Sequence, residues 1–306
     1  MDRSSLRGFV DELAASERFR AFADAFPADA RVSEAALPLV LATLFATLGT
    51  PLVCLFPEDE HARDAADAIA WYVDPDAVGL FPSRGVQPES GLEPPPHLVG
   101  ERARGIEVLA GGGLLCASAL ALAEGVPPPP ARPVALRLAP GVGLALEELV
   151  ESLSLAGYER GERADERGQI AVRGGIVDIF PSTGREPLRV EFLGDEIEQV
   201  RAFSPFTQRT LHQVERAVIQ PAAERRRDLV GPDEDRKRRS SRSRSRVSPS
   251  STRSLGRRRT RSRPSARRSR HAGSRKQRTS SRAWSGRVDA SSSRSRVRER
   301  RSVRRG

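Results

Sequence analysis

The first 226 residues of this 306-residue chain contain no lysine. A phosphate-binding loop of the Walker A type needs glycines for close approach of the backbone and a lysine that reaches the β- and γ-phosphates. The one glycine-rich run, residues 111–113, precedes a predicted strand and therefore offers no helix N-terminus to a phosphate. We predict a turn at this run, no nucleotide or other cofactor, and no enzyme that hydrolyses nucleotides.

Histidine and cysteine are also scarce. The histidines of the first 226 residues, His61, His97 and His212, lie far apart without partners at metal-ligand spacing, so no metal site is predicted. Cys54 and Cys116 each lie inside an apolar run, which is typical of buried thiols in a reducing compartment. The first residues lack the apolar segment of a secretory signal, and we expect the chain to be cytoplasmic.

Only one uncharged stretch, residues 35–56, is long enough to span a bilayer. It contains Pro38, and Gly49 and Pro51 interrupt it near its end. This punctuation predicts a buried helix up to Leu48 followed by a short strand, and no membrane association.

The first half of the chain alternates short apolar runs with amphipathic stretches. The predicted strands cover residues 52–56, 77–81 and 113–117, and the predicted helices residues 4–26, 34–48, 58–72 and 98–109. Continuous apolar strands that alternate with helices indicate an α/β fold with a mostly parallel sheet covered on both faces. The prolines at 127–130 mark the predicted end of this domain, which covers residues 1–130.

Residues 131–222 have a different pattern and predict a second, smaller α/β domain with a mixed or antiparallel sheet. Its predicted strands cover residues 134–138, 169–172, 175–180, 188–193, 197–203 and 214–220, and its predicted helix covers residues 144–157. Gly174-Gly175 and Gly194-Asp195 lie where tight turns are expected, because glycine adopts positive φ at little cost.

Three motifs follow one another in this second domain. They are RGGIVDIFP at 173–181, RVEFLGDEIE at 189–198 and FSPFTQRTL at 203–211. Their order and spacing resemble the UvrB interaction domain, which the excision-repair protein UvrB shares with the transcription-repair coupling factors. The resemblance is stronger to the coupling factors and covers about residues 30–224.

The resemblance implies that the second domain docks the damage-recognition protein UvrA, with Arg173 and Arg189 on the docking face. Phe192 and Leu193 complete the implied site, and Leu193 stands where the family often has a second aromatic residue. The first domain resembles a degenerate RecA-like domain of UvrB, in agreement with the missing lysine. Full-length coupling factors also contain an RNA polymerase-binding domain and a DNA translocase. Neither is found in this sequence, so we predict an adaptor without a motor.

The residues alone leave another interpretation of these arginines open. Arg173 and Arg189 would then be ordinary strand residues, paired across the sheet with Glu191 or Asp178. Arginine is, however, enriched among interface anchors, because its planar guanidinium pairs well with carboxylates.

The two ends of the chain differ sharply in charge. Residues 1–226 carry 22 arginines and 34 acidic residues, a net charge of −12, whereas residues 227–306 carry 29 basic and 6 acidic residues, a net charge of +23. We predict that residues 223–306 form a disordered Arg/Ser-rich tail, because so few apolar residues cannot form a core. As an alternative function, this tail would bind DNA or RNA non-specifically by neutralising phosphates.

The tail also has the composition of a shifted reading of GC-rich DNA. We therefore hypothesise that the residues after a point within 224–236 are translated out of frame. The coding DNA tests this hypothesis: if neither alternative frame restores sequence that resembles a coupling factor, the hypothesis fails.

Overall fold

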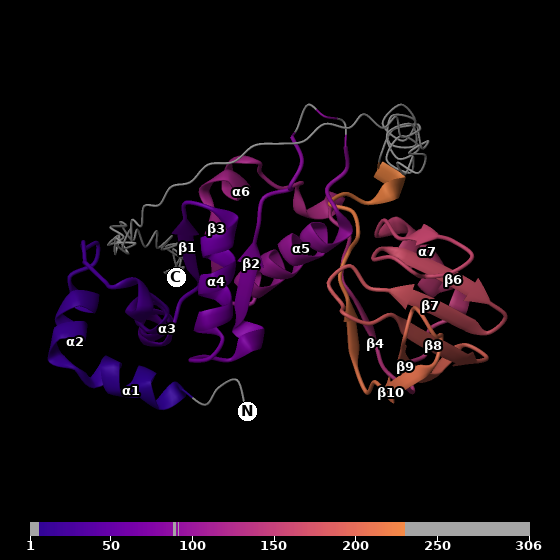
Figure 1. Cartoon of the computed structure of the whole chain (residues 1–306), viewed down its shortest axis with the longest axis horizontal. Coiled ribbons are helices and arrows are strands. Elements are labelled where there is room, and N and C mark those ends of the chain that lie inside the picture. The colour runs from indigo at the N-terminus through magenta and orange to yellow at the C-terminus, as the bar shows by residue number, and fades with distance from the viewer. Residues whose placement is uncertain (1–5, 88–89, 91, 230–306) are drawn as a thin grey trace, which may run out of the picture.

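Three apolar strands form a parallel sheet in the computed structural model, which describes residues 6–87, 90 and 92–229 (Figure 1). The strands are β1 (Leu52–Phe56), β2 (Val78–Phe81) and β3 (Leu114–Ser118), in the spatial order β1-β3-β2. Every residue of the central strand β3 is buried, as expected for a strand with a neighbour on each side and helices over the sheet. The predicted parallel sheet is confirmed.

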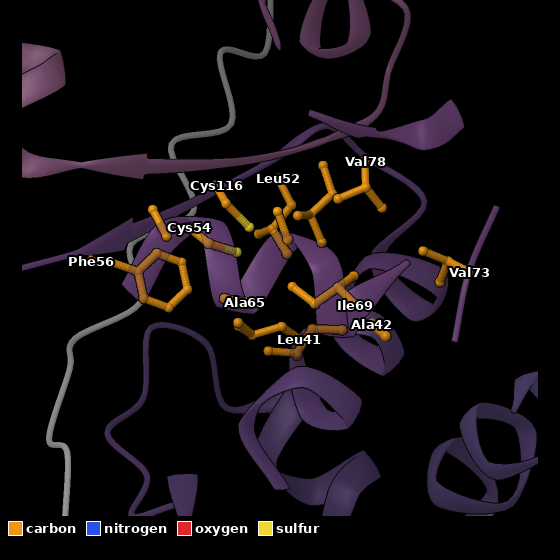
Figure 2. Packing of buried hydrophobic residues seen from close by; sticks show 14 of the residues in the cluster. Leu41, Ala42, Leu52, Cys54, Phe56, Ala65, Ile69, Val73, Val78 and Cys116 are labelled. Carbon is orange, nitrogen blue, oxygen red and sulfur yellow. The ribbon is translucent and has the colours of Figure 1, made fainter. Parts of the chain in front are cut away.

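Helices cover both faces of this sheet. They are α3 (Leu37–Leu48), α4 (Asp59–Ile69), α5 (Pro96–Ala110) and the short α6 (Ala119–Ala123). On one face Leu41 of α3 and Ile69 of α4 pack with Cys54 and Cys116 of the sheet, as Figure 2 shows. On the other face Ile106 of α5 packs with apolar residues of β2 and β3. The prediction that both cysteines are buried is therefore confirmed.

The uncharged stretch of residues 35–56 divides as its punctuation predicts. α3 ends at Leu48, Gly49 adopts φ 60°, and β1 begins three residues later. Within the described ranges, no helix is both long enough and apolar enough to cross a membrane.

The predicted helix over residues 4–26 is wrong, because the segment forms two helices, α1 (Arg7–Ala15) and α2 (Glu17–Asp24). Ser16 between them has an extended backbone, and its Oγ accepts a hydrogen bond from the Phe19 amide at 3.3 Å. A serine side chain that caps a following helix in this way competes with continuation of the preceding one. The next helix also starts differently from the prediction, since the 3-10 turn η1 (Glu34–Ala36) precedes α3.

Strands between residues 159 and 213 form a six-stranded sheet, which lies on the right in Figure 1. In spatial order its strands are β10 (Thr210–Gln213), β9 (Glu196–Phe203), β8 (Leu188–Leu193), β7 (Ile176–Phe180), β6 (Gln169–Arg173) and β5 (Glu159–Arg160). All neighbours are antiparallel except β5 and β6, so the predicted mixed sheet is confirmed. Helix α7 (Leu146–Leu155) buries Leu149 and Leu153 in the core of this sheet.

The turns between these strands form at the expected glycines. Gly174 adopts φ 56° between β6 and β7, and Gly194 adopts φ 62° between β8 and β9. The predicted strand over residues 214–220 is shorter than expected: β11 (Ala217–Ile219) pairs only with β4 (Leu136–Leu138) in a two-stranded sheet. This pairing brings the beginning and the end of the second domain together.

The predicted division into domains at residues 130 and 222 stays a prediction. The predicted disordered tail starts too early, because residues 223–229 are ordered: Glu224 pairs with Arg84 and Arg102, and a 3-10 turn, η5 (Arg227–Leu229), follows. The rest of the predicted tail, residues 230–306, lies outside the described residues.

Candidate functional site

One face of the six-stranded sheet carries a row of charged side chains. Alternation along β7 and β8 places Val177 and Val190 on the face that packs against α7, and it places Asp178, Arg189 and Glu191 on the opposite face. In the flanking strands, Arg173 of β6 and Arg201 of β9 lie on that same opposite face by register. We call this surface, with Arg173, Asp178, Arg189, Glu191 and Arg201, the arginine face.

Arg189 is paired within the sheet. It lies directly opposite Asp178, and its Nε and Nη2 donate to Asp178 Oδ1 and Oδ2 at 2.7 and 2.8 Å. The guanidinium also lies over the ring of Phe203, 4.7 Å from the centroid. The hydrogen bond to Asp178 raises the pKa of Arg189, and the side chain stays 20% exposed. The interpretation of Arg189 as a paired strand residue thus agrees with the structure, and a partner would meet a guanidinium held in a fixed orientation.

A second ion pair lies beside the first one. Arg201 pairs with Glu191, and Gln199 Nε2 donates to the other oxygen of the same carboxylate at 2.8 Å. The centre of the arginine face is therefore a network of matched charges. Such a network orders its side chains and leaves little net charge at the centre.

Arg173 lies at the end of the arginine face and is exposed. Its Nη2 donates to the main-chain carbonyl of Glu162 at 2.7 Å. Because this acceptor is uncharged, the bond does not neutralise the positive charge of the guanidinium. Leu193 is 73% exposed at the adjacent hairpin, and alternation from Glu191 places it on the same face. A hydrogen bond joins the end of β8 to the turn after Arg173: the Phe192 amide donates to the carbonyl of Gly175 at 2.9 Å.

Phe192 occupies a different position from the other three predicted site residues. It lies opposite Ile197, and its side chain is half-buried against the hydrophobic core beneath the sheet. The structure therefore brings Arg173, Arg189 and Leu193 together on one face of the sheet. Phe192 packs on the opposite face, against the hydrophobic core.

The connection between β5 and β6 crosses the arginine face. Ala164 in this connection is buried, Glu162 accepts the hydrogen bond from Arg173, and Arg163 Nη2 donates to the carbonyl of Pro205 at 3.3 Å. Pro205 belongs to the β9–β10 connection, so this contact spans the width of the face.

A nucleotide in a parallel α/β sheet binds at the carboxyl ends of the strands. Here Asp59 begins α4 directly after β1, with Glu58 and Glu60 beside it. Asp59 Oδ1 accepts from the Ser83 amide at 3.0 Å and Oδ2 from Ser83 Oγ at 2.5 Å. Acidic side chains therefore lie in the first turn of α4, where the helix dipole favours negative charge. In the part of the chain that the structure describes, no three potential metal ligands cluster.

We expect Asp59 to make the stability of the chain sensitive to acid. Burial alone would raise the pKa of Asp59, but hydrogen bonds from Ser118 and Ser83 outweigh burial and lower it. A carboxyl whose pKa is lower in the folded state contributes stability above its unfolded pKa and loses that contribution as the pH falls through the folded value. Urea unfolding between about pH 5 and pH 2 should therefore show a weaker loss of stability in Asp59→Asn than in the unmodified chain. The same substitution at Asp76, whose carboxylate is 96% exposed, is the control, and equal pH dependence in all three proteins would contradict the expectation.

Two arginines and two glutamates form a cluster that joins the region around the parallel sheet to the segment after β11. Arg102 of α5, whose side chain is 1% exposed, donates to Glu224 Oε1 at 2.7 Å and to Glu124 Oε2 at 3.3 Å. Arg84 Nε donates to the second oxygen of Glu224 at 2.8 Å, and its amide donates to Glu124. Arg102 also donates to two main-chain carbonyls and lies over the ring of Phe81 at 4.0 Å. Every part of this guanidinium is therefore held by the protein.

Sequence reasoning missed this cluster. Glu224 lies 122 residues from Arg102 and 140 residues from Arg84, and neither arginine is part of a recognisable motif. The only available signal was the position of Arg102 in the middle of an amphipathic helix, which does not identify a partner.

Part of the chain is similar to known proteins. Residues 136–224 match the family model described as the UvrB interaction domain. The resemblance inferred from the three motifs is confirmed.

Similar proteins include the transcription-repair-coupling factor of Myxococcus xanthus, 30% identical over 242 residues, which are 76% of this chain and 19% of that protein. The coupling factor of Mycobacterium bovis is 32% identical over 193 residues, 60% of this chain and 16% of that protein. The UvrABC system protein B of Methanothermobacter thermautotrophicus is 40% identical over 87 residues, 28% of this chain and 14% of that protein. The chain thus spans about a fifth or less of the length of these relatives.

Proposed function

We propose that this chain is a cytoplasmic adaptor that docks UvrA in nucleotide excision repair and transcription-coupled repair. The docking surface is the arginine face, where Arg173 and Leu193 make direct contact. Arg189 offers its remaining exposed edge, and Phe192 holds β8 in place. The proposal assigns no catalytic reaction to the chain.

One observation carries this proposal. An exposed arginine and an exposed leucine adjoin on a hydrogen-bonded sheet, within the segment that matches the family model of the UvrB interaction domain. Exposed apolar and arginine side chains on a preordered surface are the usual anchors of protein interfaces. The neighbouring ion pairs keep this surface ordered before a partner arrives.

We expect Arg173→Ala to weaken binding of the full chain to purified UvrA by about 1–3 kcal/mol, the range for an interface anchor. Isothermal titration calorimetry measures this difference. Arg173 is the better test residue because Arg189→Ala would leave the buried Asp178 carboxylate unpaired and would disturb the fold as well.

Arg137→Ala provides a matched control, since Arg137 is 72% exposed but belongs to β4, in the two-stranded sheet outside the arginine face. It should leave the affinity unchanged. Equal affinities of the unmodified chain, Arg173→Ala and Leu193→Ala would contradict the assignment of the docking face.

A second candidate function concerns the net charge of +23 on residues 227–306. This segment would bind DNA or RNA through phosphates, with an affinity that falls steeply as salt rises. A chain that ends at residue 226 should then lose its retention on DNA. Equal retention of the two chains would contradict the second function and leave UvrA docking unaffected.

A further inference from the structure

The connection between β9 and β10, residues 204–209, presents a phenylalanine to solvent. Phe206 is 93% exposed, the highest value of any large apolar side chain in the described part of the chain. A fully exposed phenylalanine side chain buries no apolar surface and so contributes nothing to the stability of the fold. Removal of this surface from water is favourable, and it happens only when a partner covers the side chain.

Hydrogen bonds within the connection hold its backbone in one shape. The Ser204 amide donates to the carbonyl of Arg209 at 2.9 Å, and the Gln208 amide donates to the carbonyl of Ser204 at 2.8 Å. The Gln208 side chain also donates to the carbonyl of Pro205 at 2.9 Å, while its backbone adopts φ 60°. Phe206 is thus displayed by a closed loop, so little conformational entropy would be lost when it binds.

This loop is continuous with the arginine face. The carbonyl of Pro205, next to Phe206, accepts the hydrogen bond from Arg163 in the connection that crosses that face. Strand β9 leads from the hairpin of Leu193 to this loop over 8 residues, a separation of about 26 Å at roughly 3.3 Å per residue. An interface of ordinary size covers about 800 Å² on each partner, or roughly 28 Å across. One partner of ordinary size can therefore cover both exposed side chains.

We propose that Phe206 is a second anchor of the same docking surface, so that the partner's surface has two apolar pockets separated by a strip that carries carboxylates. Leu193 enters one pocket and Phe206 the other. The carboxylates face Arg173, whose hydrogen bond within the chain goes to a main-chain carbonyl and not to a carboxylate. This inference rests on the proposed function, because it assigns Phe206 to the partner that binds the arginine face.

Calorimetric titration of the full chain with purified UvrA tests the inference with three variants. Phe206→Ala should weaken binding about 10-fold or more, which corresponds to more than about 1.4 kcal/mol. Phe206→Leu should recover part of the affinity, since it restores apolar contact. Val134→Ala is the matched control, because Val134 is 79% exposed but lies in the segment before β4, outside the docking surface. None of the three should change the thermal unfolding midpoint by more than about 1–2 °C, because each side chain is largely solvated.

The outcomes separate this inference from the proposed function. If Arg173→Ala weakens binding while Phe206→Ala does not, the second anchor is wrong and UvrA docking stands. If Phe206→Ala weakens binding while Arg173→Ala does not, the two residues do not belong to one surface and the inference is also wrong. If neither variant changes the affinity, the proposed function itself fails.

Discussion

Replacing Arg102 with alanine is expected to lower the free energy of unfolding by about 3–5 kcal/mol, as is usual when one partner of a buried ion pair is removed. Burial lowers the pKa of Arg102, and Glu224 together with Glu124 offsets part of that cost. Without Arg102 each of these carboxylates would lose one donor and keep the hydrogen bond from Arg84. Urea denaturation of the full chain at pH 7 measures the change.

Arg137→Ala is the matched control for this prediction. Arg137 also pairs with a glutamate of α5, Glu107, at 2.5 Å, but the two side chains are 72% and 44% exposed. An exposed pair of this kind contributes about 0–1 kcal/mol. If both alanine variants were equally stable, the ion pairs of Arg102 would not contribute to stability as expected.

Gly105→Ala is also expected to have a large effect and to lower the free energy of unfolding by about 3 kcal/mol. Helix α5 approaches β2 so closely that a Cβ at Gly105 would lie 2.5 Å from the carbonyl oxygen of Leu80 and 2.9 Å from a methyl carbon of Leu115. The oxygen belongs to the main chain of a paired strand, so it can move away only if α5 shifts from the sheet.

Gly8→Ala is the same substitution at another site, and we expect it to raise the free energy of unfolding. Gly8 lies in α1 with open space around its Cα, so alanine should stabilise this helix by about 0.5–1 kcal/mol. The two variants should therefore move the urea midpoint in opposite directions. A stabilising effect at Gly105 would mean that α5 does not pack against β2 as described.

Strong local patterns in the sequence predicted much of this fold. The continuous apolar runs of β1, β2 and β3 indicated a buried parallel sheet, and the glycines at 174 and 194 located two hairpin turns. In residues 173–211, the three motifs indicated the resemblance before any geometry was known.

The elements that sequence reasoning missed lack such patterns. β10 has four exposed residues and no alternation, and β5 has two residues that become a strand only by pairing with β6. The break at Ser16 depends on a capping hydrogen bond, which an otherwise helical pattern conceals.

The candidate site was predicted only in part. Motif resemblance selected Arg173, Arg189 and Leu193, which share one face, but it could not show that Asp178 already pairs with Arg189. Phe206 lies in the third motif, at 203–211, yet its exposure depends on the shape of the loop around it. The Arg102 cluster joins residues more than a hundred positions apart, and no local signal encodes such a pairing.

The position of Glu224 has a consequence for how this protein could be divided. Glu224 is the last residue of the segment matched to the UvrB interaction domain, and its carboxylate is held by Arg84 and Arg102 of the preceding unit. An isolated fragment of residues 136–224 would leave the Glu224 carboxylate without either arginine, and the remaining fragment would lose the carboxylate that Arg84 and Arg102 share. Cutting the chain at the limits of the family match therefore separates ion-pair partners.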